Sequence, residues 1–380
     1  MSVAIPSASF FSHFATIEDP RMQRTQLHKL GDLLFIAVCA TLCGANAFTA
    51  MEEFGRSKIA WLKKFLELPN GIPSHDTFRN VFIAIKPEAF TECFLSWVKG
   101  LNIPIKNKIV AIDGKTSRAS GSKTNGKKAL HTVSAWATAA NLVLGQVVTE
   151  EKSNEITAIP KFLNMLELRG AIVTTDAMGW QKEIATEVRE RGADYVLQVK
   201  GNQEHLEEDI IDAFAAMDEA STKERVAQGI EVFETRDSKH GRKEYRRCET
   251  MPVPKTLRNL AEWKDLTSIC RVARIYDEND EPKSDVRYFI SSLSAKAKRL
   301  AEAVRGHWGV ENGLHWVLDM AFDDDRNRTE AGDAPENLAT LRRWVLSLLR
   351  QDKSRKGGIE CKRMQMGWNE GYLEAILGLD

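Results

Sequence analysis

The spacing of hydrophobic residues divides the chain into stretches with different expected structures. Up to about residue 100, apolar residues recur at helical spacing, first over 27–47 and then over 58–68. Pro69-Asn70-Gly71 ends the second of these segments, because proline and glycine both interrupt a helix. We therefore expect an α-helical N-terminal domain over residues 1–100.

From residue 108 the apolar residues come in short runs instead, which is typical of buried strands. The first strand ends abruptly at Asp113, and a hairpin, a helix, a strand, a second helix and a last strand follow. This order opens with three strands and then alternates, so it predicts a mixed sheet with flanking helices over 101–200. The expected segments are 109–112, 131–139, 142–149, 159–168, 171–175, 181–191 and 194–200, with Ala140-Asn141 as the hairpin turn.

Residues 201–293 have a different pattern, which begins with an acidic helix and continues as strands. The expected elements are a helix over 204–217 and strands over 232–235, 244–250, 268–276 and 286–292. We interpret this stretch as a β-rich insertion. Helical spacing then returns in the C-terminal part, 294–380, over 295–320 and 337–350.

The charge of the chain is balanced, with 53 lysines and arginines against 53 aspartates and glutamates. No overall positive charge therefore indicates a polyanionic partner, and any nucleic-acid footprint has to be local. Two basic segments are candidates: 99–128 holds eight basic residues against one acid, and 342–363 holds eight against two. Such runs are also common as plain solvated faces.

The cysteines and the most apolar segment bear on the cellular location. The six cysteines are scattered and form no close-set pairs, so a reducing cytosol fits better than a secreted disulfide framework. The segment 33–51 is uncharged, but Thr41, Gly44 and Asn46 dilute it and no signal-peptide pattern precedes it. We expect a buried helix there, no membrane partner and a cytoplasmic protein.

Two aspartates, Asp113 and Asp176, each follow a short apolar strand. In open α/β sheets the carboxyl ends of the strands are where ligands gather, so these acids can meet although they are far apart in sequence. Two neighbouring carboxylates repel each other unless a cation lies between them, and hard carboxylate oxygens suit Mg²⁺. The alternative is structural, because aspartate after a strand is also a common turn former and helix cap.

A third acid, Glu311, lies in a glycine-rich helical segment, Arg305 to Trp316. Three glycines there each cost about 1 kcal/mol relative to alanine, so close approach to a backbone or a ligand is one reason for them. His307, Glu311 and His315 recur every fourth residue and share one helical face. This spacing also raises a zinc site as a rival, although it lacks the two-histidine pattern of helical zinc proteases.

The same segments resemble a known family. The blocks Ala111-Ile112-Asp113-Gly114-Lys115-Thr116, Lys152 to Pro160 and Thr174-Thr175-Asp176-Ala177-Met178 look like those of bacterial insertion-sequence transposases, including the H-repeat-associated proteins of Rhs elements. Further matches extend over nearly the whole chain. They are 71–77, 194–197, 200–203, 240–242, His307-Trp308, Glu311-Asn312 and Leu314-His315-Trp316.

The resemblance implies a ribonuclease-H-like fold, split by the β-rich insertion, with an Asp-Asp-Glu triad at Asp113, Asp176 and Glu311. It implies that two Mg²⁺ ions, for which Mn²⁺ can substitute, serve DNA cleavage at the ends of an insertion sequence and strand transfer into target DNA. The expected partners are double-stranded DNA and a second copy of the chain. The expected place is the bacterial cytoplasm, at the nucleoid, and the N-terminal domain is a candidate for binding the DNA ends.

The resemblance is weaker for the residues that would contact DNA. Related transposases outside this subgroup carry a tyrosine and an arginine before the glutamate and a lysine after it, whereas this chain has His307, Trp308 and Leu318 in the corresponding neighbourhood. The candidates here are Lys115, Arg242, Arg305, His307, Trp308 and Asn312. Two alternatives remain open, namely a nuclease of this fold that cuts without joining and an inactive remnant that only binds DNA.

Overall fold

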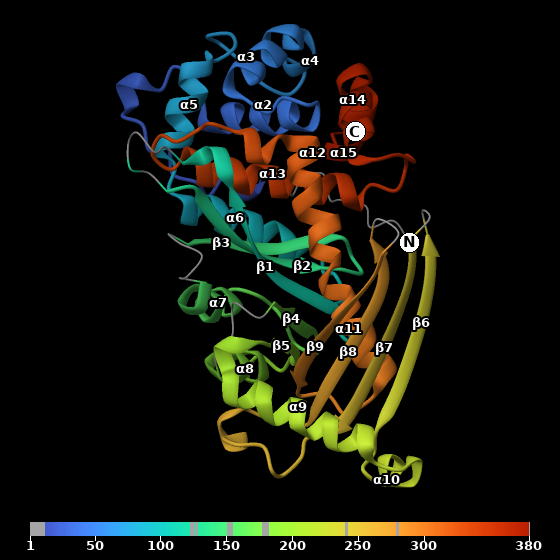
Figure 1. Cartoon of the computed structure of the whole chain (residues 1–380). Coiled ribbons are helices and arrows are strands. Elements are labelled where there is room, and N and C mark those ends of the chain that lie inside the picture. The colour runs from blue at the N-terminus through green and yellow to red at the C-terminus, as the bar shows by residue number, and fades with distance from the viewer. Residues whose placement is uncertain are drawn as a thin grey trace.

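The computed structural model describes residues 12–121, 126, 128–149, 155–176, 182–239, 242–278 and 281–379. Its centre is a nine-stranded mixed sheet in the order β3-β2-β1-β4-β5-β9-β8-β7-β6 (Figure 1). The pairs β1–β4 and β4–β5 are parallel, and the other pairs are antiparallel. The strands are β1 (Ile109–Ser117), β2 (Leu130–Ala137), β3 (Leu142–Thr149), β4 (Ile172–Thr175), β5 (Asp194–Val199), β6 (Glu231–Lys239), β7 (Arg242–Pro252), β8 (Ser268–Glu278) and β9 (Glu281–Ser291).

Helices surround this sheet (Figure 1). The N-terminal helices α2 to α5 gather at one end of the molecule, and α13 lies between them and the sheet. Side chains of these helices and of strands β1 to β5 share one large hydrophobic core. The helices are α2 (Leu30–Leu42), α3 (Phe48–Ser57), α4 (Ile59–Leu62), α5 (His75–Ala84), α6 (Pro87–Gly100), α7 (Glu155–Leu163), α8 (Lys182–Glu190), α9 (Glu204–Glu219), α10 (Thr222–Ala227), α11 (Ala297–His307), α12 (Trp316–Phe322), α13 (Ala334–Gln351), α14 (Ile359–Trp368) and α15 (Glu370–Leu377).

These elements confirm the predicted fold class, a ribonuclease-H-like mixed sheet interrupted by a β-rich insertion after an N-terminal helical region. The order from β1 to β5 is the predicted sequence of three strands, a helix, a strand, a helix and a strand. The apolar segment that raised a membrane question forms α2, nearly all of whose residues are buried in the core. Among the described residues, no helix is long and apolar enough to span a bilayer.

One predicted boundary is wrong in a way that matters for the site. The first strand does not end at Asp113, because β1 continues to Ser117. Its antiparallel partner β2 pairs with it through Ser117↔Leu130, whereas its parallel partner β4 pairs only as far as Ile112↔Thr175. Asp113 therefore lies inside β1, one residue past the point where β1 and β4 separate.

The insertion does not form a separate sheet. Strand β9 pairs antiparallel with β5, so the four strands β6 to β9 extend the central sheet on that side. Helix α11 then packs across the junction between the two parts. A second hydrophobic cluster joins Leu300, Ala303 and Val304 of α11 to side chains of β4, β5, β7, β8 and β9.

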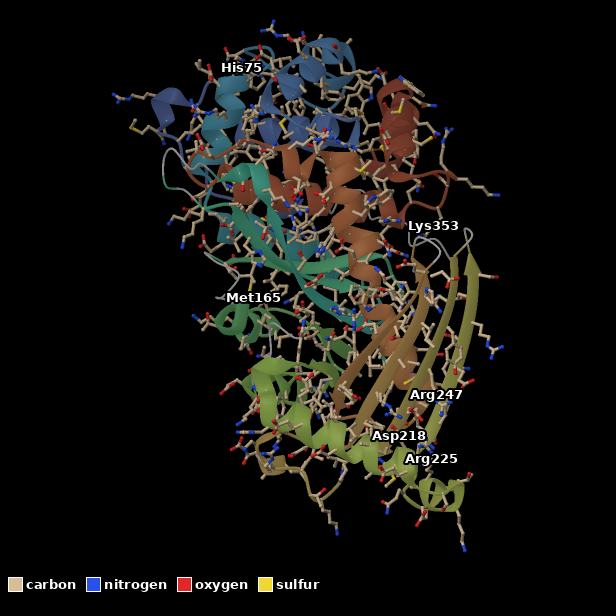
Figure 2. All side chains as sticks on the ribbon, in the orientation of Figure 1. His75, Met165, Asp218, Arg225, Arg247 and Lys353 are labelled. Atoms are coloured by element: carbon tan, nitrogen blue, oxygen red, sulfur yellow. The ribbon has the colours of Figure 1, made fainter. Side chains whose placement is uncertain are left out.

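Ion pairs attach the helices of the insertion to its strands. Figure 2 shows Asp218 of α9, Arg225 of α10 and Arg247 of β7 close together at one end of these strands. Buried Glu249 accepts from Arg225 at 2.6 Å and from Arg247 at 3.0 Å, and Arg271 bridges Glu249 and Asp218. A buried carboxylate with three guanidinium partners is satisfied, so this cluster is structural.

The basic segment 342–363 is not a continuous charged face. Arg342, Arg343, Lys362 and Arg363 are buried. Arg363 donates to backbone carbonyls of Thr41 and Ala321, and Lys362 donates to that of Leu349. Half of the basic residues counted in this segment therefore hold α13 and α14 in place. The exposed Lys353, Arg355 and Lys356 are the part of the segment for which a nucleic-acid contact stays a prediction.

Candidate active site

Asp113 and Glu311 come together in the folded chain. Ligand atoms of Asp113, Glu311 and His315 all lie within 4.8 Å of one another, the one such group among the described residues. Asp113 comes from β1, and the other two come from the turn between α11 and α12. The side chain of Glu311 is 56% exposed, that of Asp113 is 22% exposed, and His315 is buried between the helix and the sheet. The structure therefore brings together Asp113 and Glu311, two acids of the predicted triad that are far apart in the sequence.

His315 contacts both carboxylates through one ring nitrogen. Its Nδ1 lies 3.2 Å from Oε2 of Glu311 and 3.5 Å from Oδ2 of Asp113. The hydrogen bond from His315 lowers the pKa of Glu311, against the effect of partial burial, and the charge of Lys115 lowers it further. Glu311 is therefore an anion at neutral pH. The helical spacing predicts that His315 lies on the same helical face as Glu311, but the predicted triad does not include His315.

Asp176 follows β4 directly beside Asp113. The register Ile112↔Thr175 makes Asp113 and Asp176 the next residues along the two parallel strands. Adjacent strands lie about 4.8 Å apart, so the two backbones are neighbours here. Asp176 does not belong to the 4.8 Å group of Asp113, Glu311 and His315. The structure thus brings together two of the three predicted acids and places the third at the end of the adjacent strand, outside this group.

His307 lies on the β4 side of this arrangement. Its Nδ1 is 3.1 Å from Oγ1 of Thr174, two residues before Asp176 on the same strand. Burial lowers the pKa of His307 to about 4, although the negative charge of Asp176 opposes this shift. The ring is therefore neutral at neutral pH. His307 is not part of the group around Glu311, so the three-residue zinc site considered from the spacing is not formed among the described residues.

A π-helical turn lies between α11 and α12 and contains Glu311 and His315, two of the three residues of the group. It runs from Glu311 to His315, and such turns often occur at functional positions because they re-aim side chains. Three glycines explain why the helical segment from Arg305 to Trp316, which includes this turn, lies so close to the sheet. A Cβ on Gly306 would lie 2.4 Å from Ile109, one on Gly309 2.7 Å from Thr138, and one on Gly313 2.7 Å from Trp136. The absence of a Cβ at these three glycines thus allows the segment to pack closely against β1 and β2.

Three side chains of β1, those of Asp113, Lys115 and Ser117, contact the C-terminal part of the chain. Lys115 is the second of them. Its Nζ lies 2.6 Å from Asp319 and 3.3 Å from Asp325, and the side chain is 7% exposed. Farther along β1, Ser117 donates to Oδ2 of Asp324 at 2.8 Å. Lys115 therefore has two carboxylate partners, and the contact with a DNA phosphate that we expected for it stays a prediction.

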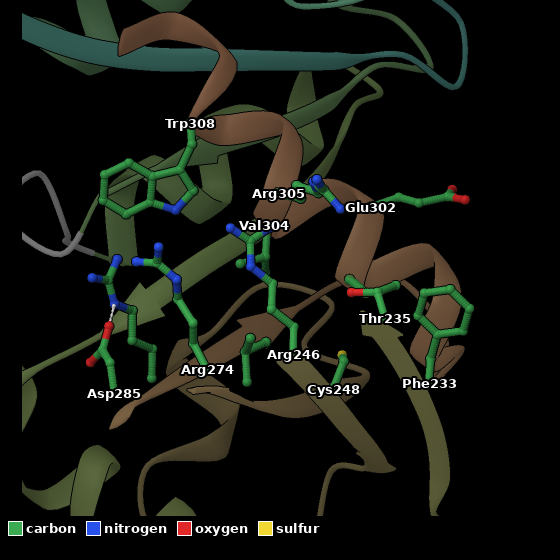
Figure 3. Close-up of a pocket in the computed structure, with 13 residues that line it drawn as sticks. Phe233, Thr235, Arg246, Cys248, Arg274, Asp285, Glu302, Val304, Arg305 and Trp308 are labelled. Atoms are coloured by element: carbon green, nitrogen blue, oxygen red, sulfur yellow. Dashed lines mark hydrogen bonds and ion pairs between the residues drawn. The ribbon is translucent and has the colours of Figure 1, made fainter. Parts of the chain in front are cut away.

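Two of the other residues expected to contact DNA, Arg305 and Trp308, line a cavity of about 420 Å³ between α11 and the insertion strands. Figure 3 shows Trp308 and Arg305 on the helix, with Arg246 and Arg274 reaching toward them from the strands. Trp308 is 47% exposed and lies under the guanidinium of Arg287. Arg305 pairs with Asp237 at 2.6 Å.

Two further candidates are Asn312 and Arg242. Asn312 is exposed beside Glu311. Arg242 begins β7, and its side chain lies outside the described residues.

Comparison with known families identifies the family to which this chain belongs. A family model described as "Transposase DDE domain" matches residues 104–348, which include Asp113, Asp176 and Glu311. The chain belongs to this transposase family. A second model, described as "DDE_Tnp_1-associated", matches residues 11–98, the N-terminal helical region.

Curated relatives of this transposase chain match it over nearly its full length. The chain is 40% identical over 374 residues to "Putative transposase YncI" of Escherichia coli O157:H7, covering 97% of this chain and 94% of that protein. It is 38% identical over 370 residues to "H repeat-associated putative transposase YhhI" of Escherichia coli strain K12, covering 96% of each. A cryo-EM structure of a piggyBac transposase synaptic complex with hairpin DNA aligns with a TM-score of 0.45 and 9% identity, covering 100% of this chain and 78% of that one.

The residues of this transposase fit a divalent metal ion. Two carboxylates that would otherwise repel converge from different elements, and Asp176 lies on the adjacent strand. Oxygen ligands of this kind are those that Mg²⁺ and Mn²⁺ prefer. The exposed side chain of Glu311 also leaves the group open to a substrate.

Proposed function

We propose that this chain is an active DNA transposase, which hydrolyses phosphodiester bonds at the ends of an insertion sequence and joins those ends to target DNA. The observation that carries the proposal is the convergence of Asp113 and Glu311 beside the end of β4, where Asp176 follows. Membership of the transposase family supports the same reaction. The names of the bacterial relatives support insertion-sequence DNA as the substrate.

Asp113, Asp176 and Glu311 would hold two divalent ions, Mg²⁺ with Mn²⁺ as a substitute. Bound there, the ions supply an activated oxygen nucleophile and stabilise the charge that develops on the phosphate. The residues themselves supply the geometry: Asp113 is fixed by its pairing with Ser134 of β2, one residue past the end of the pairing with β4, and Glu311 is fixed by the π turn and its contact with His315.

The proposal assigns roles to the rest of the chain as well. Residues 1–100 would bind DNA ends, 101–200 and 294–380 would form the catalytic part, and 201–293 would be the β-rich insertion between them. Arg305, Trp308 and Asn312 would contact the DNA near the cut, because they flank Glu311 on the same helical segment. Two copies of the chain would act on a pair of ends, as expected for a transposase.

Cleavage and joining of labelled DNA test this proposal. The substrate is DNA that carries the inverted repeats flanking the coding sequence, supplied uncut or precut with a separate target. We expect cleavage and joined product from the wild-type protein with Mg²⁺. Asp113→Asn and Glu311→Gln should each reduce both reactions by on the order of a hundred-fold or more, because each removes a charged metal ligand, while DNA binding persists.

The outcomes separate the alternatives. Cleavage without joining of the precut end would indicate a nuclease of the same fold, and binding without either reaction would indicate an inactive remnant. Cleavage by the wild-type protein that does not depend on a divalent ion would contradict the proposed chemistry altogether.

A further inference from the structure

The imidazole of His315 is held more firmly than the carboxylate it contacts. The His315 side chain is 6% exposed and that of Glu311 is 56% exposed, although they lie on the same turn. A free glutamate side chain samples several rotamers, and fixing it in one of them costs conformational entropy. A buried ring that donates to Oε2 of Glu311 at 3.2 Å can offset part of this cost before any ligand arrives.

The position of the ring hydrogen follows from the surroundings of both nitrogens. Nε2 of His315 is buried and has no hydrogen-bond partner among the residues that the structure describes. A buried N–H without an acceptor is costly, so hydrogen on Nε2 is disfavoured. The hydrogen therefore belongs on Nδ1, where the oxygens of Glu311 and Asp113 can both accept it.

Polar contacts along β1 keep His315 in register with Asp113. Alternate residues of the strand meet residues farther along the C-terminal segment: Asp113 meets His315, Lys115 meets Asp319 of α12, and Ser117 meets Asp324 just beyond the end of α12. Two strand residues span about 6.6 Å and four helical residues about 6.0 Å, so the step from Asp113 to Lys115 matches the step from His315 to Asp319. The backbone carbonyl of Gly313 also accepts from Arg350 at 3.1 Å.

We propose that His315 is a positioning residue, which holds the carboxylate of Glu311 beside that of Asp113 through its Nδ1–H and so preorganises the metal site. This assignment rests on the proposed function. A ring nitrogen that carries hydrogen cannot coordinate a metal through the same atom, and hard divalent ions favour the carboxylate oxygens. His315 thus acts on the ions through Glu311, in the way that outer residues orient metal ligands elsewhere.

Metal affinity of variants, measured without DNA, tests the assignment. The amount of free Mn²⁺ is followed by electron paramagnetic resonance for the wild-type protein, His315→Leu, His315→Gln and a control, Met320→Leu, which changes an exposed residue of α12. We expect His315→Leu to raise the dissociation constant for Mn²⁺ about ten-fold. His315→Gln, whose amide can donate to Glu311, should recover most of the affinity, and Met320→Leu should match the wild type.

Two further readouts make the result specific. Cleavage by His315→Leu should return to within about three-fold of the wild-type rate at saturating Mn²⁺, because a positioning residue changes occupancy rather than the reaction. Thermal unfolding in EDTA shows whether each variant is folded. If His315→Leu is not, His315→Gln separates a positioning ring from an imidazole ligand, because its amide can replace the hydrogen-bond donor, and Mn²⁺ affinity that folded His315→Gln fails to recover would overturn the assignment.

Each of the other outcomes would overturn either the role assigned to His315 or the proposed function. Equal Mn²⁺ affinity in folded His315→Leu and the wild type would overturn the assignment, and so would cleavage that saturating Mn²⁺ fails to restore, because that would make the ring a ligand or a catalytic group. An absence of both Mn²⁺ binding and cleavage in the wild type would instead overturn the proposed function, and the assignment with it.

Discussion

At the scale of single residues, the interior of this protein contains charges that are matched by partners. Asp324 is fully buried, and Oδ1 accepts from Arg342 at 2.8 Å while Oδ2 accepts from Ser117 at 2.8 Å. Burial raises the pKa of Asp324, but the charges of Arg342 and Arg343 outweigh it and hold the pKa below its usual value. Asp324 therefore links α13 to β1, the strand that carries Asp113.

Replacing Asp324 should show how much this link contributes. We expect Asp324→Asn to lower the free energy of unfolding by about 3 kcal/mol, because removal of one partner leaves a buried guanidinium uncompensated. Urea denaturation at neutral pH measures this change. Asp76→Asn is the control, since the side chain of Asp76 is 70% exposed, and it should change the value by less than about 0.5 kcal/mol. Equal effects of the two substitutions would show that the buried ion pair contributes nothing.

At the scale of elements, the site depends on how closely the helical segment 297–322 approaches the sheet. Gly306, Gly309 and Gly313 lie on the face toward β1 and β2, and each lacks the Cβ that would collide there. The contact at Gly313 is the least adaptable, because the side chain that it meets is the fully buried ring of Trp136. The position of Glu311 relative to Asp113 therefore depends on glycine two residues later.

Adding one methyl group tests this dependence. We expect Gly313→Ala to lower the free energy of unfolding by about 1–3 kcal/mol through overpacking, and to weaken Mn²⁺ binding as the segment moves away from the sheet. Gly100→Ala is the matched control, because no atom lies within 4 Å of a Cβ built on Gly100. It should change stability by less than about 1 kcal/mol. If Gly313→Ala behaves like this control, the glycines have no packing role.

The sequence predicts elements better than it predicts their pairing. Periodicity identifies the strands and helices around Asp113 and Asp176, because it depends on local burial. It could not predict that β1 continues to Ser117, since that depends on the length of β2. It also could not predict the π turn, because an altered hydrogen-bond pattern leaves the spacing of Glu311 and His315 unchanged in the sequence. His315 was consequently assigned to a rival zinc pattern rather than to the carboxylates.

At the scale of the whole molecule, one sheet joins the insertion strands β6 to β9 to strands β1 to β5. The chain leaves the core after β5, builds β6 to β9, and returns because β9 pairs with β5 (Figure 1). Helix α11 follows directly and crosses the sheet toward β1, which brings Glu311 to Asp113. The insertion thus returns the chain to the sheet where the C-terminal helices can complete the site, a relation that no local pattern in the sequence expresses.

Cleavage of the protein backbone by bound iron would locate the proposed metal site. Fe²⁺ in place of Mg²⁺ would generate hydroxyl radicals with ascorbate and peroxide, and these radicals cut the backbone nearby. We expect cuts near residues 113, 176 and 311, which excess Mg²⁺ suppresses and Glu311→Gln weakens. Cuts that are absent from these three positions, or that neither Mg²⁺ nor Glu311→Gln affects, would contradict a shared metal site built from Asp113, Asp176 and Glu311.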